Sequence, residues 1–163
     1  MKNGNIAIYY GVGKGKTSVS LGKGILALAD DLRVVMIQFL SYCDHKEIAL
    51  LENMEPDFRV FRFEKYRDTQ EMTEEMKKEI TSEVRNGFNF VKKIIDTGEC
   101  DMLMLDGILE CIKEGYLTEQ ELLDVMEKRP AYMDMILTGS SVSDGIVQKA
   151  DFVYQITTEK EPV

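Results

Sequence analysis

The chain has 163 residues, of which 44% are apolar and 30% charged, and this composition is typical of a folded globular domain rather than of a disordered protein. Its net charge of −9 argues against general nucleic-acid binding, which needs a basic face, and no apolar run approaches the roughly 20 residues that span a bilayer. The N-terminus shows no signal-peptide pattern and the three cysteines are scattered, so we expect one cytoplasmic domain over residues 1–163 with no nucleic-acid or membrane partner.

The first predicted elements are a strand at residues 6–10, a glycine-rich turn at residues 11–17, and a helix at residues 18–29. The turn reads Gly-Val-Gly-Lys-Gly-Lys-Thr and is one residue shorter than the common phosphate loop. Backbone N–H groups in such a turn form an anion nest, and the following helix adds the positive end of its dipole. Lys16 can reach phosphate oxygens, and the Thr17 hydroxyl can ligate Mg²⁺. This context predicts a nucleoside triphosphate site; the alternative is a flexible turn that binds nothing.

Further along the chain, apolar runs alternate with helical patterns. Strands are predicted at residues 34–39, 59–63, 102–105, 133–137 and 152–156. The runs at 34–37, 102–105 and 135–137 are continuously apolar, as in parallel strands that are buried on both faces. A helix is predicted from about residue 73 to 97 by one apolar stripe, with Gly98 as its stop. Thr118 and Glu121 predict a capping box for a helix that reaches about Lys128 and ends before Pro130.

This order of elements predicts an α/β fold, a single-domain three-layer sandwich of the P-loop NTPase kind with a mainly parallel sheet. Asp106 directly follows the strand at 102–105, and in parallel sheets ligands bind at the carboxyl ends of the strands. We therefore predict that Asp106 holds Mg²⁺ directly or through water. Its alternative role is the N-cap of a helix that starts near Ile108. Glu110 is a weaker candidate for a further carboxylate, because it should lie almost one helical turn beyond Gly107.

The chain resembles the ATP:corrinoid adenosyltransferases, whose short loop reads Gly-x-Gly-Lys-Gly-Lys-Thr, and the matches follow the family's order along nearly the whole chain. The matching segments are Gly11 to Thr17, Ile37-Gln38-Phe39-Leu40, Leu105-Asp106, Arg129-Pro130, Leu137-Thr138-Gly139 and Ala150-Asp151. The resemblance implies transfer of the adenosyl group of ATP to a cobalt(I) corrinoid, with release of triphosphate. Cobalt(I) is itself the nucleophile, so no general base is needed, which agrees with a sequence whose single histidine, His45, is predicted in a polar loop.

The resemblance also implies roles for individual residues. ATP would be bound by Gly11, Gly13, Lys14, Gly15, Lys16, Thr17, Ser18, Gln38 and Thr138. Thr17 and Asp106 would hold Mg²⁺, and Lys14 and Lys16 would stabilise the charge of the leaving triphosphate. A reductase or flavoprotein that supplies electrons and a second copy of the chain in a homodimer are the partners that the family implies.

Two positions differ from the family's usual pattern: Gly107 stands where Glu follows the strand aspartate, and Ser140 stands where Arg follows Thr-Gly. They keep open the alternative of a non-catalytic relative that binds ATP, and also a corrinoid, without turnover. A third reading is a P-loop ATPase or kinase, which would form ADP. The short loop counts against that reading, and so does Gly107, because no carboxylate follows Asp106 to orient a water molecule.

Overall fold

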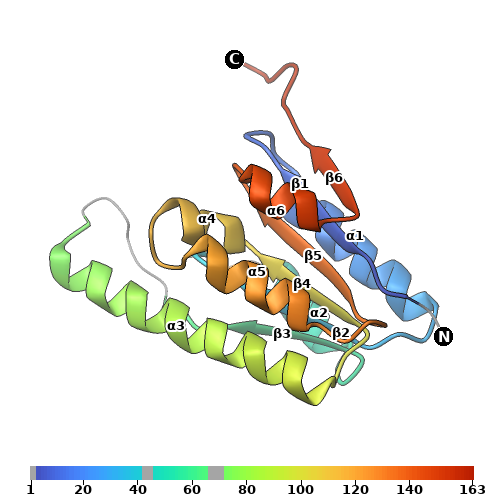
Figure 1. The fold of residues 1–163 in the computed structure, drawn as a ribbon. Helices are drawn as coiled ribbons and strands as arrows, with labels where there is room; N and C mark the ends of the chain where they lie inside the picture. Colours follow the sequence, from blue (N-terminus) through green and yellow to red (C-terminus); the bar gives the residue numbers. More distant parts are fainter. Residues whose placement is uncertain (1–2, 42–45, 66–71) are drawn as a thin grey trace.

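The computed structural model describes residues 3–41, 46–65 and 72–163, which form a six-stranded sheet flanked by helices (Figure 1). The strand order is β3-β2-β4-β5-β1-β6, and each described pairing is parallel. The strands are β1 (Ile6–Tyr10), β2 (Val34–Gln38), β3 (Phe58–Arg62), β4 (Met102–Asp106), β5 (Asp134–Gly139) and β6 (Phe152–Gln155). The predicted α/β class with a mainly parallel sheet is therefore confirmed. Strand β1 has the predicted bounds. The other strands begin at the predicted residue or one residue from it, and they end one or two residues from the predicted end.

The helices lie on both faces of the sheet and complete the three layers (Figure 1). They are α1 (Lys16–Ala29), α2 (Lys46–Glu52), α3 (Glu74–Thr97), α4 (Ile108–Lys113), α5 (Glu119–Lys128) and α6 (Asp144–Lys149). Helices α1 and α2 cover one face and contribute Ala27 and Leu51 to its apolar cluster. The other four helices cover the opposite face, where Ile80, Leu122 and Ile146 join a larger cluster. None of the described helices is long and apolar enough to cross a membrane.

The buried strands explain why the sheet lies at the centre of the molecule. Every residue of β2 and of β4 is buried, as their continuous apolarity predicts. Alternate side chains serve the two faces: Val35 and Ile37 enter the larger cluster, whereas Val34 and Met36 enter the smaller one. Burial of both faces fixes the register of these strands, because a slip by one residue would exchange the two sets.

The longest helix and the helix beside it carry the predicted end signals. The Thr73 hydroxyl accepts a hydrogen bond from the Met76 N–H at the start of α3, and Gly98 ends that helix with φ 62°. Thr118 and Glu121 form the predicted capping box of α5. Two short helices, α2 and α6, are not predicted by the sequence patterns.

Because the strands are parallel, their carboxyl ends meet at one edge of the sheet (Figure 1). The glycine turn follows β1 there, Phe39 follows β2, and β5 ends at Gly139. Residues 156–163 run past the same edge after β6. The fold therefore assembles four sequence-distant segments around one site.

Candidate functional site

The glycine turn after β1 is held in a closed shape by its own lysine. The Lys16 Nζ donates hydrogen bonds to the carbonyl oxygens of Gly11 at 2.6 Å and of Gly13 at 2.9 Å. Gly11 has φ 130°, and a Cβ there would lie 2.1 Å from the Ile156 carbonyl oxygen, so a side chain is excluded on both counts. Gly15, with φ 105°, is the N-cap of α1. The turn thus needs glycine for its backbone shape and for close contact with the chain after β6.

Several hydrogen-bond donors of this turn are available to an anion. The N–H groups of Lys16, Thr17 and Ser18 lie in the first turn of α1, where a helix offers no intrahelical acceptor for them. The Gly13 N–H, in contrast, donates to the Ile156 carbonyl oxygen at 3.1 Å. The Lys14 ammonium is exposed and lies 3.6 Å from the Glu161 carboxylate. The N–H groups available to an anion therefore lie at the start of α1, whereas Gly13 and Lys14 contact the C-terminal segment.

Asp106 connects the predicted site residues. Its carboxylate accepts hydrogen bonds from the Thr17 hydroxyl at 3.1 Å, from the Thr138 hydroxyl at 2.8 Å and from Gln38 Nε2 at 3.4 Å. The Gly107 N–H donates to the Thr138 hydroxyl oxygen at 2.8 Å and orients it. Side chains from β2, β4, β5 and α1 thus meet at one carboxylate. The alternative role of Asp106 as a helix N-cap is wrong, because Gly107 takes that position in α4.

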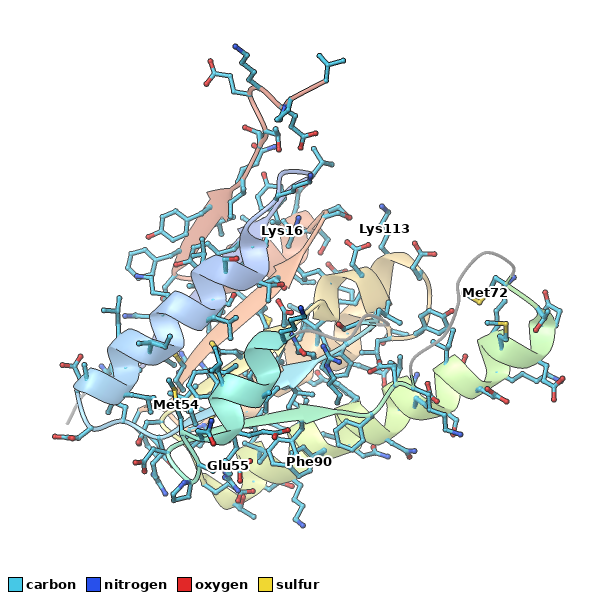
Figure 2. The ribbon with its side chains drawn as sticks, turned by 180° about the vertical axis from the view of Figure 1, so that it is seen from behind. Lys16, Met54, Glu55, Met72, Phe90 and Lys113 are labelled. Carbon is cyan, nitrogen blue, oxygen red and sulfur yellow. The ribbon has the colours of Figure 1, made fainter. Side chains whose placement is uncertain are left out.

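A hollow of about 280 Å³ opens over this carboxylate at the carboxyl edge of the sheet. Its lining residues are Lys16, Thr17, Phe39, Leu40, Ser41, Asp106, Gly107, Glu110, Thr138, Gly139 and Ser140. Five of the residues selected from the sequence are among them, namely Lys16, Thr17, Asp106, Glu110 and Thr138. Gln38 is buried beneath the hollow and reaches it through its hydrogen bond to Asp106. Figure 2 shows Lys16 at this edge of the molecule.

The segment after β2 forms one wall of the hollow and depends on two residues that sequence reasoning did not select. The Leu40 N–H donates a hydrogen bond to the Glu64 carboxylate at 3.1 Å. The backbone of Leu40 has an uncommon positive φ of 52°. Arg62 Nε donates to the Gln38 side-chain oxygen at 2.7 Å and orients that amide toward Asp106. Glu64 is buried, and this burial raises the pKa of its carboxyl group although the Leu40 N–H lowers it. β3 reads Phe-Arg-Val-Phe-Arg, and the charge of Arg62 at the carboxyl end of this strand was the signal available for it.

The donor set of the hollow fits a hard cation that arrives with phosphates. The Thr17 hydroxyl and the Asp106 carboxylate are oxygen ligands of the kind that Mg²⁺ takes in nucleotide sites. The described residues contain no group of three or more His, Cys, Asp or Glu that could form a metal cage of its own. His45 lies outside the described residues. Cys100 and Cys111 are buried, and desolvation raises the pKa of the Cys100 thiol to about 12, which makes it a poor nucleophile.

Comparison with known proteins gives a match over almost the whole chain. The family model described as ATP:corrinoid adenosyltransferase BtuR/CobO/CobP matches residues 2–163. A corrinoid adenosyltransferase of Escherichia coli K12 is 26% identical over 160 residues, which cover 98% of this chain and 79% of the relative. The corrinoid adenosyltransferase CobA of Salmonella typhimurium is 25% identical over the same shares. A Pseudomonas aeruginosa corrinoid adenosyltransferase is 24% identical and covers 98% of this chain and 77% of its own length.

Among solved structures, a DNA replication initiation factor matches with 19% identity and a TM-score of 0.45. The match covers 94% of this chain, which spans 40% of the length of that protein.

Proposed function

The chain belongs to the ATP:corrinoid adenosyltransferase family, and from this membership we propose that it transfers the 5′-deoxyadenosyl group of ATP to the cobalt(I) centre of a corrinoid. The observation that carries the proposal is the convergence of Lys16, Thr17, Asp106 and Thr138 on one hollow at the carboxyl edge of the sheet. The family match over residues 2–163 supports the same activity independently of this geometry.

In the proposed reaction, the electron pair of cobalt(I) attacks the 5′-carbon of ATP and forms a carbon–cobalt bond. The bond between that carbon and its oxygen breaks, its electron pair leaves with triphosphate, and the cobalt becomes formally cobalt(III). The corrinoid thus supplies the nucleophile, and the protein contributes orientation and charge stabilisation. The attack on the 5′-carbon needs no proton transfer, so orientation and charge stabilisation are the roles left to the site residues.

The charge that develops on triphosphate determines the proposed roles of the site residues. Lys16 and the N–H groups at the start of α1 would stabilise this charge, together with the exposed Lys14. Thr17 and Asp106 would hold the Mg²⁺ ion that accompanies ATP and offsets its negative charge. For Lys16 to act on phosphate, its ammonium must exchange the Gly11 and Gly13 carbonyl oxygens for phosphate oxygens. We further propose that a reductase or flavoprotein supplies cobalt(I) and that the active form is a homodimer.

The test is incubation of the protein with ATP, Mg²⁺ and chemically reduced cobalamin, with the Escherichia coli relative as positive control. The expected products are adenosylcobalamin, followed by its absorption spectrum, and triphosphate, identified by ion-exchange chromatography. Lys16→Met should lower the rate by about 100-fold, the usual effect of removing one donor that stabilises transition-state charge. Lys23→Met on the exposed side of α1 is the matched control and should keep the wild-type rate.

The products also separate the proposed transfer from its alternatives. Binding of ATP without adenosylcobalamin, under conditions in which the control enzyme is active, would overturn the proposal in favour of a non-catalytic relative. Formation of ADP in place of triphosphate would indicate a phosphate-transfer enzyme.

A further inference from the structure

Two hydroxyl–carboxylate pairs lie side by side at the carboxyl edge of the sheet. The Thr138 hydroxyl donates to Asp106, and two residues further along the chain the Ser140 hydroxyl donates to Glu110. Asp106 and Glu110 both line the hollow that contains Lys16 and Thr17. The first pair belongs to the site around Asp106, whereas neither Ser140 nor Glu110 is among the ATP and Mg²⁺ ligands proposed so far.

Gly107 shows why a carboxylate at this edge must come from another position. It has φ 82°, and a Cβ on it would lie 2.4 Å from the Phe39 carbonyl oxygen. Both the backbone angle and the contact exclude a glutamate at position 107 in this backbone. Glu110 lies on the first turn of α4 and places a carboxylate in the same hollow.

Within the described residues, the carboxylate of Glu110 is held through one of its two oxygens. The Ser140 N–H donates to Oε1 at 2.5 Å, and the Ser140 hydroxyl donates to the same oxygen. Oε2 accepts no hydrogen bond from the described part of the chain. Burial alone would raise the pKa of this carboxyl group, but the hydrogen bonds from Ser140 and the charges of Lys113 and Lys16 lower it below its ordinary value. Glu110 is therefore an oriented, ionised carboxylate whose Oε2 has no hydrogen-bond partner among the residues that the structure describes.

Lys113 brings a cation to the same cluster. It lies in the last turn of α4, three residues after Glu110, and its Nζ is 3.3 Å from the Ser140 hydroxyl oxygen. Figure 2 shows Lys113 and Lys16 at the same edge of the molecule, on two different helices. Glu110 is electrostatically coupled to both lysines. An anion in the hollow would thus meet positive charge from α1 and from α4.

We propose that α4 supplies the second carboxylate and the second cation of the nucleotide site: Glu110 contributes a ligand to the divalent cation of ATP, and Lys113 binds the triphosphate. Ser140 is a positioning residue that orients both side chains. The inference depends on one part of the proposed function, namely that ATP binds in this hollow. It also accounts for Gly107 and Ser140, which replace the family's glutamate and arginine. Glu110 and Lys113 of α4 would supply the carboxylate and the cation that these positions lack.

The experiment measures ligand binding by calorimetry in the absence of any corrinoid. The ligands are ATP with and without Mg²⁺, inorganic tripolyphosphate, and adenosine. The variants are Glu110→Gln, Lys113→Gln, Lys113→Arg and Ser140→Ala. Lys128→Gln is the matched control, because Lys128 is also the lysine of the last turn of its helix, α5. Thermal unfolding of each variant reports whether the fold is intact.

Glu110→Gln should reduce by about tenfold the factor by which Mg²⁺ strengthens ATP binding, and Ser140→Ala should change the same factor in the same direction. Lys113→Gln should weaken binding of both tripolyphosphate and ATP by about tenfold, without changing adenosine binding. Lys113→Arg should restore most of this loss, and Lys128→Gln should bind every ligand as the wild type does.

An unchanged Mg²⁺ effect in Glu110→Gln, together with unchanged tripolyphosphate binding in Lys113→Gln, would overturn the inference. A wild-type protein that binds no ATP would overturn it as well. The binding data are independent of the adenosyl transfer assay, so a protein that binds as expected but forms no adenosylcobalamin would contradict the proposed function and not the role of α4.

Discussion

Glu64 is a buried carboxylate that stabilises one wall of the hollow over Asp106, because it accepts a hydrogen bond from the Leu40 N–H. Burial raises the pKa of Glu64 in the folded chain, and the nearby Glu83 charge acts in the same direction. Between the ordinary pKa and this raised value, the folded state binds more protons than the unfolded state. The free energy of unfolding therefore decreases as pH rises through that window.

We predict that Glu64→Gln removes this pH dependence. The free energy of unfolding of the variant should exceed that of the wild type by more at neutral pH than below the ordinary glutamate pKa. The glutamine oxygen can still accept the Leu40 N–H, so the wall should keep its shape. Urea unfolding across the acidic to neutral range measures the effect. Glu75→Gln, on an exposed glutamate of α3, is the control and should retain the wild-type slope. A parallel pH profile for Glu64→Gln and the wild type would contradict the prediction.

Residues that carry their own local signal were predictable from the sequence, whereas Gln38 and Thr138, which contact Asp106 across the sheet, were found only through the resemblance to the family. Other residues that act through tertiary contacts were not found. Lys16 and Thr17 follow from a contiguous turn, and Asp106 follows from its place at the end of an apolar strand. Glu64 and Arg62 belong to the site only because β3 lies beside β2 and directs their side chains to Leu40 and Gln38. Pairing of strands that are distant in sequence leaves no trace in a local pattern.

At the scale of elements, the periodicity of apolar residues and the capping residues determined which helices could be predicted. Helix α3 has a repeated apolar stripe and both end signals, so its predicted and observed ends agree within one residue. Helices α2 and α6 have seven and six residues, too few for a period of 3.6 to be recognisable. The ends of β4 and β5 extend to Asp106 and Gly139, because their backbone pairing continues past the last apolar side chain.

The capping box of α5 also connects this helix to α3. The Thr118 hydroxyl accepts the Glu121 N–H, the Glu121 carboxylate accepts the Thr118 N–H, and Arg85 of α3 pairs with the same carboxylate. These contacts, led by the Arg85 hydrogen bond, lower the pKa of Glu121 to about 2.

We predict that Thr118→Ala lowers the free energy of unfolding by about 1 kcal/mol, because the first turn of α5 loses the acceptor for one of its N–H groups. Thr81→Ala is the matched control: Thr81 lies within α3, where its hydroxyl donates back to the Lys77 carbonyl oxygen. Alanine should be neutral or slightly stabilising at that position. Chemical denaturation of both variants measures the difference, and equal losses would indicate that the cap contributes little.

At the scale of the whole molecule, the sequence predicted the class of sheet but not its strand order. Continuous apolar runs indicate parallel, buried strands, and helices between them indicate crossovers. They do not determine that β1 lies between β5 and β6, which comes from long-range pairing. This arrangement matters for the site, because it puts the residues after β6 against the glycine turn: the Gly13 N–H bonds to the Ile156 carbonyl oxygen, and Glu161 pairs with Lys14.

The contact between the C-terminal segment and the turn leads to a prediction about ATP affinity. The Glu161 carboxylate lies 3.6 Å from the Lys14 ammonium, so it would compete with a phosphate for that charge. Since both side chains are largely exposed, at 89% and 50%, the pair should contribute less than about 1 kcal/mol. Glu161→Gln should therefore strengthen ATP binding by about two- to fourfold at low salt, and the gain should disappear at about 1 M salt, where the charges are screened.

Glu159→Gln is the control variant. It removes the same charge from the same segment and separates a specific contact from a general change in net charge. Calorimetric titration with ATP measures both variants: a gain confined to Glu161→Gln supports competition for Lys14, whereas equal gains in the two variants would show that the segment acts only through its overall negative charge.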